Sequence, residues 1–285
     1  MRKRILGYEA SDFTQERTSQ EFKEAILKAE GRTILVDLAA ETAPLYPEVT
    51  NGEMAAAFGA DLLLLKDFDV QKMSVPGLGE IKDLSELRKL TGTAVGVNLI
   101  IKDTGPEYKR VTEASIKELL RKRINFLSLT AYVTPEASPE RIVADIKKVR
   151  RFYDGFLMLN PVVSHGSELL WDNLKAYIDA GVDMIDLPAP GAVPGTTEEQ
   201  IARLAFAIRK TGTLVDCVVG TSQEGADKRT IQSLALAAKR VGADVFELGD
   251  AGVAGMPAPE NIFHASMTIR GKRHTYVRMA RSANR

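Results

Sequence analysis

The chain has 285 residues, of which 38 are Lys or Arg and 38 are Asp or Glu, so its formal net charge is zero. This balance gives no electrostatic reason to expect binding to nucleic acid. The apolar runs are far shorter than the ~20 residues that a membrane span needs. The single cysteine, Cys217, excludes an internal disulfide and a thiolate metal cage. The first residues lack the apolar core of a secretory signal, so we expect a cytoplasmic protein.

Eight short apolar segments recur along the chain and predict the strands of a parallel sheet. Their starts are 29 to 33 residues apart, which is the length of one strand, its crossover helix and the joining loops. The segments are nearly continuous in apolar residues, as expected for strands that are covered on both faces. They are RTILVDLA (32–39), DLLLLKDF (61–68), AVGVNLI (94–100), NFLSLTA (125–131), DGFLMLN (154–160), DMIDLPA (183–189), TLVDCVV (213–219) and ADVFELG (243–249).

Signals for helix starts and ends separate these segments. Capping boxes are predicted where a short polar residue is followed three residues later by an acid, and Ser138 before Pro139 predicts another start. The boxes are Thr50 with Glu53, Asp83 with Glu86, and Thr196 with Glu199. The junctions FGADLLLL (58–65), AGVDMIDL (180–187) and VGADVFEL (241–248) are nearly identical, which indicates internal repeats of one strand-helix unit.

Eight such units predict an α/β fold of the (β/α)₈ TIM-barrel class, with an open doubly wound sheet as the structural alternative. We predict a single domain over 1–285, with an N-terminal extension (1–31), the barrel (32–269) and a basic C-terminal tail (270–285). Residues 19–31 are amphipathic and predict an extra helix, which could close the barrel floor. The tail contains six Lys or Arg and no acid, and we expect it to be solvated and frayed. Contact with an anion or with another subunit is the alternative.

Barrel enzymes place their active sites at the carboxyl ends of the strands, which selects the candidate site residues. Acids in apolar strands are costly to bury unless they are paired, hydrogen-bonded or bound to a metal. The acids could form an acid/base pair, could bind Mg²⁺ together with the two asparagines, or could have a purely structural role. The candidate catalytic residues are Asp37, Lys66, His165, Asp186 and Glu247, and the candidate substrate-binding residues are Asn98 and Asn160.

Lys66 and His165 have different predicted roles. Lys66 follows four leucines and could form a Schiff base, bind phosphate or, as we favour, form an ion pair with an acid such as Asp37. His165 follows the fifth strand, and histidine is well suited to proton transfer near neutral pH. As a working hypothesis, His165 and Asp37 (or Glu247) move protons, while Lys66 neutralises or activates a substrate carbonyl.

Two glycine-rich loops follow the seventh and eighth strands and predict a phosphate site. Small residues let backbone amides approach an anion, and the following helices add the positive ends of their dipoles. Asp250 opposes this interpretation, because a carboxylate in the site would repel phosphate. The predicted phosphate-binding residues are Gly220, Thr221, Ser222, Gly249, Asp250, Ala251 and Gly252.

These loops resemble the phosphate-binding (β/α)₈ barrel superfamily, with GTS (220–222) and GDAG (249–252) as the matching motifs. Residues 50–70, 220–227 and 270–280 also resemble an uncharacterised bacterial barrel family, some of whose members are labelled haloacid-dehalogenase-like hydrolase or phosphoenolpyruvate phosphonomutase. That resemblance implies no catalytic residues. Asp67 and Asp69 partly match the Asp-x-Asp motif of haloacid-dehalogenase phosphatases, although Gln71 occupies its fifth position. They are the metal candidates, for Mg²⁺.

The predicted function is binding of a small phosphorylated or carboxylated metabolite at the mouth of the barrel, with lyase, aldolase or isomerase chemistry by proton transfer. A phosphoester hydrolase that uses Asp67 and Asp69 with Mg²⁺ is one alternative. A non-catalytic metabolite-binding or partner protein is another, so the sequence leaves catalysis itself open. We expect no nucleic-acid or membrane partner, and we expect a homo-oligomer.

Overall fold

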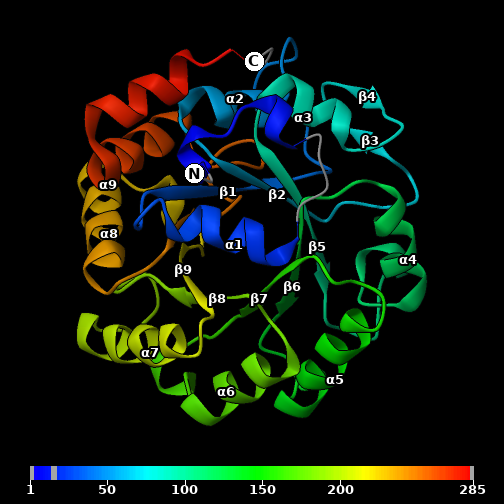
Figure 1. Ribbon diagram of the computed structural model, residues 1–285, viewed down its shortest axis with the longest axis vertical. Coiled ribbons are helices and arrows are strands. Elements are labelled where there is room, and N and C mark those ends of the chain that lie inside the picture. Colours follow the sequence, from blue (N-terminus) through cyan, green and yellow to red (C-terminus); the bar gives the residue numbers. More distant parts are fainter. Residues whose placement is uncertain (1–2, 14–17, 283–285) are drawn as a thin grey trace.

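The eight predicted strands form a closed parallel barrel, which confirms the (β/α)₈ fold over the open sheet (Figure 1). The structure is a computed structural model, and it describes residues 3–13 and 18–282. The strand order around the barrel is β1-β10-β9-β8-β7-β6-β5-β2. The barrel closes at β1, where Leu35 is the register partner of both Leu62 in β2 and Glu247 in β10.

The bounds of the elements follow the predicted rhythm. The barrel strands are β1 (Thr33–Ala39), β2 (Leu62–Lys66), β5 (Ala94–Ile100), β6 (Phe126–Ala131), β7 (Phe156–Pro161), β8 (Met184–Pro188), β9 (Leu214–Val219) and β10 (Val245–Leu248). The helices are α1 (Ser19–Leu27), α2 (Asn51–Phe58), α3 (Ser85–Thr91), α4 (Glu113–Arg121), α5 (Pro139–Arg150), α6 (Trp171–Ala180), α7 (Glu198–Lys210), α8 (Lys228–Arg240) and α9 (Pro259–Ala280). The short hairpin β3 (Ser74–Val75) and β4 (Gly79–Glu80) follows β2, and 3₁₀ turns occur at Ile5–Gly7 (η1), Ala10–Phe13 (η2), Glu107–Lys109 (η3), Gly166–Glu168 (η4) and Gln223–Gly225 (η5).

The predicted helix starts are largely confirmed. Thr50 and Glu53 form a complete capping box at α2, and the Ser138 hydroxyl caps α5. Helix α7 begins one residue later than predicted, because the cap is Thr197 and the Thr196 hydroxyl donates to the carbonyl of Val193 instead. At α3, the Asp83 carboxylate accepts a hydrogen bond from the Ser85 amide. The Glu86 carboxylate accepts a hydrogen bond from the Lys82 amide. Among the helices of the described residues, none is both long and apolar enough to cross a lipid bilayer.

Alternation along the strands separates the interior into two apolar regions. One set of side chains packs outward against the surrounding helices, as Ile185 and Leu187 of β8 do. The other set points into the barrel, where Met184 belongs to a second cluster at the amino-terminal end of the strands. Residues two and four positions further along each strand therefore line the upper lumen.

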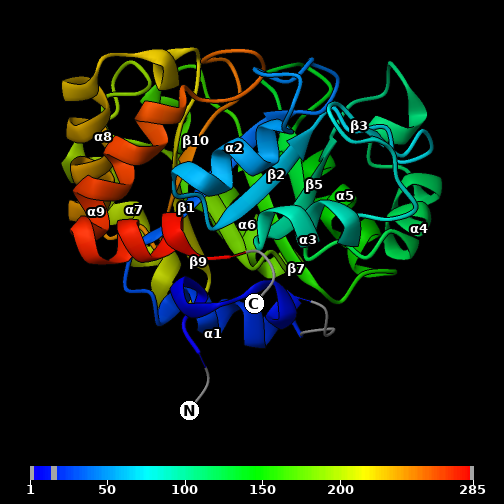
Figure 2. The same cartoon turned by 90° about the horizontal axis from the view of Figure 1, so that it is seen from above.

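Helix α1 closes the lower end of the barrel, as the amphipathic segment 19–31 suggested (Figure 2). Its Phe22 ring stacks on Phe126 with centroids 6.0 Å apart and meets Phe156 edge-on at 5.0 Å. Burying an aromatic or aliphatic side chain of this size contributes about 1.5–3 kcal/mol. The floor is therefore a packed apolar plug, and the polar side chains of the lumen lie above it.

The internal repeats form the same interaction three times at the lower rim. In each junction the aspartate before the strand accepts a hydrogen bond from a neighbouring strand's amide and also pairs with an arginine. Asp61 binds the Ile34 amide at 3.0 Å, Asp183 that of Leu157 at 3.0 Å, and Asp244 that of Val215 at 3.0 Å. Their arginine partners are Arg270, Arg150 and Arg209, respectively.

The predicted frayed C-terminal tail is wrong for the described part of this segment. Residues up to Ala280 belong to α9, which kinks at Gly271 where φ is 70°. Arg270 is buried and binds Asp61 at 2.5 Å, while the Arg278 Nε donates to the carbonyl of Ala60 at 2.8 Å. Arg270 and Arg278 thus satisfy an acid and carbonyl groups at the rim, whereas Lys272 and Arg273 of the same segment are exposed. Residues 283–285 lie outside the described residues.

The pair of Arg270 and Asp61 predicts a large loss of stability on substitution. Arg270→Ala should lower the free energy of unfolding by about 3–5 kcal/mol, because it leaves the buried Asp61 carboxylate without its main counterion. Arg240→Ala is the matched control, since Arg240 pairs with Glu198 on the exposed surface and should cost less than about 1 kcal/mol. Urea denaturation followed by circular dichroism measures both, and equal losses would contradict this account.

Candidate functional site

A cavity of about 390 Å³ opens at the carboxyl ends of the strands, where the fold predicts a site. Its floor contains Asp37 of β1, Lys66 of β2 and Asp186 of β8, and its wall contains apolar residues from β7, β8, β9 and the loops that follow β7 and β8. Val162, Val163, Pro188, Val193 and Val218 supply most of that wall. The cavity therefore combines a charged floor with an apolar side, as small-molecule sites commonly do.

Every barrel strand contributes a polar residue to the upper lumen or the cavity, and the acids are gathered on one side. Four consecutive strands, β8, β9, β10 and β1, carry the buried acids Asp186, Asp216, Glu247 and Asp37. The other four, β2, β5, β6 and β7, carry Lys66, Asn98, Ser128, Thr130 and Asn160. The lumen is thus divided into an acidic half and a half that contains one cation and neutral hydrogen-bonding groups.

Lys66 is held directly by groups from two other strands, and a third strand supports one of these groups. Its Nζ lies 3.5 Å from Asp37 Oδ2 and 3.5 Å from Thr130 Oγ1, and the Thr130 hydroxyl donates to Asn98 Oδ1 at 2.7 Å. Burial lowers the pKa of Lys66, but the charges of Asp37 and Glu247 outweigh it, so that the pKa is raised. An amine that stays protonated is a poor Schiff-base nucleophile, so the geometry favours the ion-pair role for Lys66.

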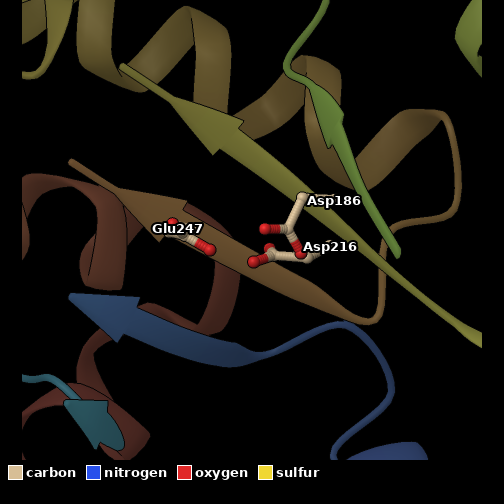
Figure 3. Close-up of side chains that lie close together, drawn as sticks. All are labelled: Asp186, Asp216 and Glu247. Atoms are coloured by element: carbon tan, nitrogen blue, oxygen red, sulfur yellow. The ribbon is translucent and has the colours of Figure 1, made fainter. Parts of the chain in front are cut away.

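Asp186, Asp216 and Glu247 form a compact carboxylate cluster, in which their side chains point toward one another (Figure 3). One oxygen from each lies within 4.8 Å of the others, and the three residues are at most 2% exposed. Among the described residues, none of their six oxygens has a hydrogen-bond partner of good geometry. Burial raises the pKa of Asp216, and the backbone amide of Cys217 is a neighbouring donor that opposes this rise. These carboxylates can therefore either share protons with one another or bind a metal ion. The three residues are the ones in the described chain that could hold such an ion.

Burial dominates the protonation of this acidic half. It raises the pKa of Asp37 to about 6, against the charge of Lys66, and the pKa of Asp216 to about 7, against a hydrogen bond with Glu247. Burial, reinforced by the charge of Asp216, raises the pKa of Asp186 well above its usual value. Burial and the neighbouring acids do the same for the pKa of Glu247. Without a cation, these acids are therefore stabilised in the neutral, protonated form.

The two predicted phosphate loops do meet, but a carboxylate of the chain itself lies between them. Glu224 is buried, and its Oε1 accepts from the Ala251 amide at 2.8 Å. The amide of Gly249 donates to the carbonyl of Val219, so it is also engaged. Asp250 lines the cavity, and Thr221 and Ser222 have left-handed backbones. Phosphate binding by Gly220–Ser222 and Gly249–Gly252 therefore stays a prediction, and these carboxylates oppose it.

His165 is not among the residues that line the cavity. It is exposed, and its Nδ1 accepts from the Ser167 amide at 3.2 Å, so that the ring caps the turn η4. Asn160 lines the cavity, whereas Asn98 reaches Lys66 only through Thr130. The proton-transfer role predicted for His165 thus has no support from its position.

Asp67 and Asp69 follow β2 but do not approach the buried acids. Asp67 is exposed, and Asp69 Oδ1 accepts from the amides of Gln71 and Lys72 in a turn. Neither lines the cavity. Their positions therefore do not support the predicted Mg²⁺ site.

Asp216 and Glu224 are the main site residues that sequence reasoning missed. Asp216 is the third residue of β9, as Asp186 is of β8 and Glu247 of β10, so aligning the repeated strands would have found it. Asp186 and Asp216 are register partners. Glu224 has no comparable signal, because its role depends on a turn that folds back toward the loop after β10.

A family model covers residues 6–285, nearly the whole chain. The chain belongs to the family described as Domain of unknown function (DUF7916). No curated protein matches the sequence. The family assignment agrees with the predicted resemblance to uncharacterised barrel proteins, whereas the hydrolase and phosphonomutase labels have no support from these matches.

Three solved structures with similar folds are distant from this chain in sequence. An archaeal fructose 1,6-bisphosphate aldolase has a TM-score of 0.57 at 12% identity, with 88% of this chain and 99% of that chain covered. Pyruvate carboxylase from Rhizobium etli has a TM-score of 0.57 at 12% identity, with coverages of 94% and 30%. FabK from Thermotoga maritima has a TM-score of 0.50 at 18% identity, with coverages of 84% and 63%. The chain thus spans less than two thirds of the last two, and all three likenesses show the barrel fold alone.

The buried acids predict a specific dependence of stability on pH. Asp216 has a higher pKa in the folded protein, about 7, than its ordinary value of 3.8, which applies to the unfolded chain. Its ionisation therefore costs no folding stability below pH 3.8, and folding stability is lost as the pH rises from there toward about 7. Asp216→Asn, which cannot ionise, should therefore be more stable than the unsubstituted protein at pH 8 in EDTA, and this advantage should shrink by pH 5. Thermal melting at both pH values measures it, with Asp67→Asn as the exposed control. An advantage that did not change with pH would contradict the argument.

Proposed function

We propose that this protein is a lyase- or isomerase-type enzyme that moves a proton next to the carbonyl group of a small metabolite. The observation that supports this most directly is the ion pair of Lys66 and Asp37 on the cavity floor. The barrel fold shared with an aldolase and a carboxyltransferase is consistent with such chemistry, although the proposal rests on the residues.

The two side chains have complementary roles in the proposed reaction. The Lys66 ammonium donates a hydrogen bond to the substrate carbonyl oxygen, where negative charge develops when the enolate forms. Asp37 uses Oδ2 to hold Lys66 at 3.5 Å, while its Oδ1 has no hydrogen-bond partner. The Asp37 carboxylate, which lines the cavity, accepts the substrate proton, and the electrons of the broken bond move to the carbonyl oxygen beside Lys66.

The charges of the cavity favour a substrate with at most one negative charge. Among the described residues that line it, Lys66 is the only cation, whereas Asp37, Asp186, Glu224 and Asp250 carry carboxyl groups. A dianionic phosphate would meet more carboxylates than cations. We therefore favour a neutral or singly charged carbonyl compound over a phosphorylated one. The apolar wall suits the carbon skeleton of such a compound.

This proposal predicts proton exchange that depends on Lys66 and Asp37. In D₂O, the protein should exchange the α-protons of dihydroxyacetone or pyruvate faster than buffer does, and should act poorly on dihydroxyacetone phosphate. Lys66→Met should slow exchange by roughly 10²–10³-fold through loss of oxyanion stabilisation. Asp37→Asn should slow it by roughly 10²–10⁴-fold through loss of the base. Proton NMR measures the rates.

Lys72→Met and Asp67→Asn are the matched controls, because both side chains are exposed and outside the cavity. Exchange rates equal to those of the buffer, with pyruvate still bound, would favour the non-catalytic binding protein over the enzyme. Turnover of the phosphorylated compound alone would restore the phosphate interpretation. The hydrolase alternative has no observation in its favour, since Asp69 is engaged in a turn.

A further inference from the structure

The acidic half of the lumen contains more negative charge than the chain itself can neutralise. Asp37, Asp186, Asp216 and Glu247 are at most 3% exposed, and Lys66 is the cation near them among the described residues. Moving an unpaired carboxylate out of water costs several kcal/mol, so four ionised acids beside one lysine are not stable. Either several protons or an additional cation must occupy this half of the barrel.

The geometry of the cluster suits a cation. Oxygens from Asp186, Asp216 and Glu247 are no more than 4.8 Å apart, and two ligands on opposite sides of an ion are separated by twice the metal–oxygen distance. That separation is about 4.6–5.2 Å for Ca²⁺ and about 4.0–4.2 Å for Mg²⁺. The three oxygens can therefore contact one common ion of the size of Ca²⁺, and only a small contraction is needed for a smaller one. Carboxylates are the ligands that such hard cations prefer.

Buried polar atoms on the opposite wall give a second and independent observation. In the ring of eight strands, β6 stands opposite β10 and β5 stands opposite β9. Ser128 of β6 shares the inward face of Phe126, and Asn98 of β5 bonds to Thr130 within the lumen. Ser128 Oγ and Asn98 Nδ2 are both buried, and neither has a hydrogen-bond partner.

These two atoms face the carboxylate cluster from the other side. A hard cation that is bound by three carboxylates keeps water molecules on its remaining positions. Such waters need hydrogen-bond partners. On the facing wall the Ser128 hydroxyl can donate one hydrogen bond and accept others, and the Asn98 amide nitrogen can donate two. Buried polar groups without a hydrogen-bond partner are rare in protein interiors. Their presence on both sides of this lumen indicates that a hydrated ligand binds between the carboxylates and the facing polar groups.

We propose that Asp186, Asp216 and Glu247 bind one hard divalent cation inside the barrel, beneath the floor of the cavity. Asp216 and Glu247 do not line the cavity, whereas Asp186 does, so the ion would lie below the substrate and hold Asp186 in place from behind. The cation would enter past Asp186 and Asp37. This inference is independent of the proposed reaction, and it concerns a metal-binding site that Asp67 and Asp69 do not form.

The test is direct binding to the full-length protein without any substrate. After treatment with EDTA and its removal, the protein is titrated at pH 8 with Ca²⁺, Mn²⁺ and Mg²⁺ by isothermal titration calorimetry, and its melting temperature is measured with each ion. We expect one ion per chain, with Ca²⁺ or Mn²⁺ binding more tightly than Mg²⁺. The melting temperature should rise as ion is added, because only the folded state contains the site.

Variants locate the ion. Asp216→Asn should weaken binding at least tenfold and abolish the rise in melting temperature, and Glu247→Gln should do the same if Asp216→Asn does not fold. The double substitution of Asp67→Asn with Asp69→Asn is the control and should bind like the unsubstituted protein. Absence of binding at millimolar ion, or equal affinity in a folded Asp216→Asn variant, would overturn the proposal and leave shared protons as the neutralising charge. Neither outcome depends on the exchange activity of Lys66.

Discussion

The closure of the sheet at β1 is the constraint on which the rest of the structure depends. Because β1 pairs with β2 on one side and β10 on the other, every second side chain of all eight strands is enclosed in one lumen. Apolar residues fill its lower part together with α1, so the polar residues are confined to the part just below the mouth. An open sheet would let solvent screen these acids, whereas the closed barrel places them beside one another.

The charges enclosed in the lumen are compensated differently from those at the lower rim. Lys66 stabilises Asp37 by direct pairing, but Asp216 and Glu247 have only other acids and the facing polar wall. At the lower rim the acids are compensated by the chain itself. Asp61, Asp183 and Asp244 each form an ion pair with an arginine and accept a hydrogen bond from the amide of a neighbouring strand. Acids at the rim are thus structural, whereas Asp186, Asp216 and Glu247 have no such cationic partner among the described residues. Sites that trade stability for function have this character.

Much of the fold could be predicted because its signals are local. The even spacing of apolar segments determines the number of strands, and the copies of the helix-to-strand junction indicate a repeated unit. Asp37, Lys66 and Asp186 were found because strand ends in a barrel point toward a common mouth. Position along a strand was a sufficient guide for these residues.

The missed features depend on contacts that are distant in sequence. Arg270 appeared to belong to a solvated tail, yet its partner Asp61 is 209 residues away. Glu224 binds the Ala251 amide across two loops, which no glycine pattern reveals. His165 was chosen for its chemistry, but its ring caps a local turn. Residue type indicates what a side chain can do, whereas only the packed structure shows what it meets.

The apolar plug formed by α1 restricts how a ligand can enter and leave the barrel. Phe22 packs against Phe126 and Phe156 and closes the lower end of the barrel. A ligand that enters at the carboxyl ends of the strands must therefore leave through the same opening. A product that lingers there would block the next molecule. Entry and release would thus both use the opening at the carboxyl ends of the strands.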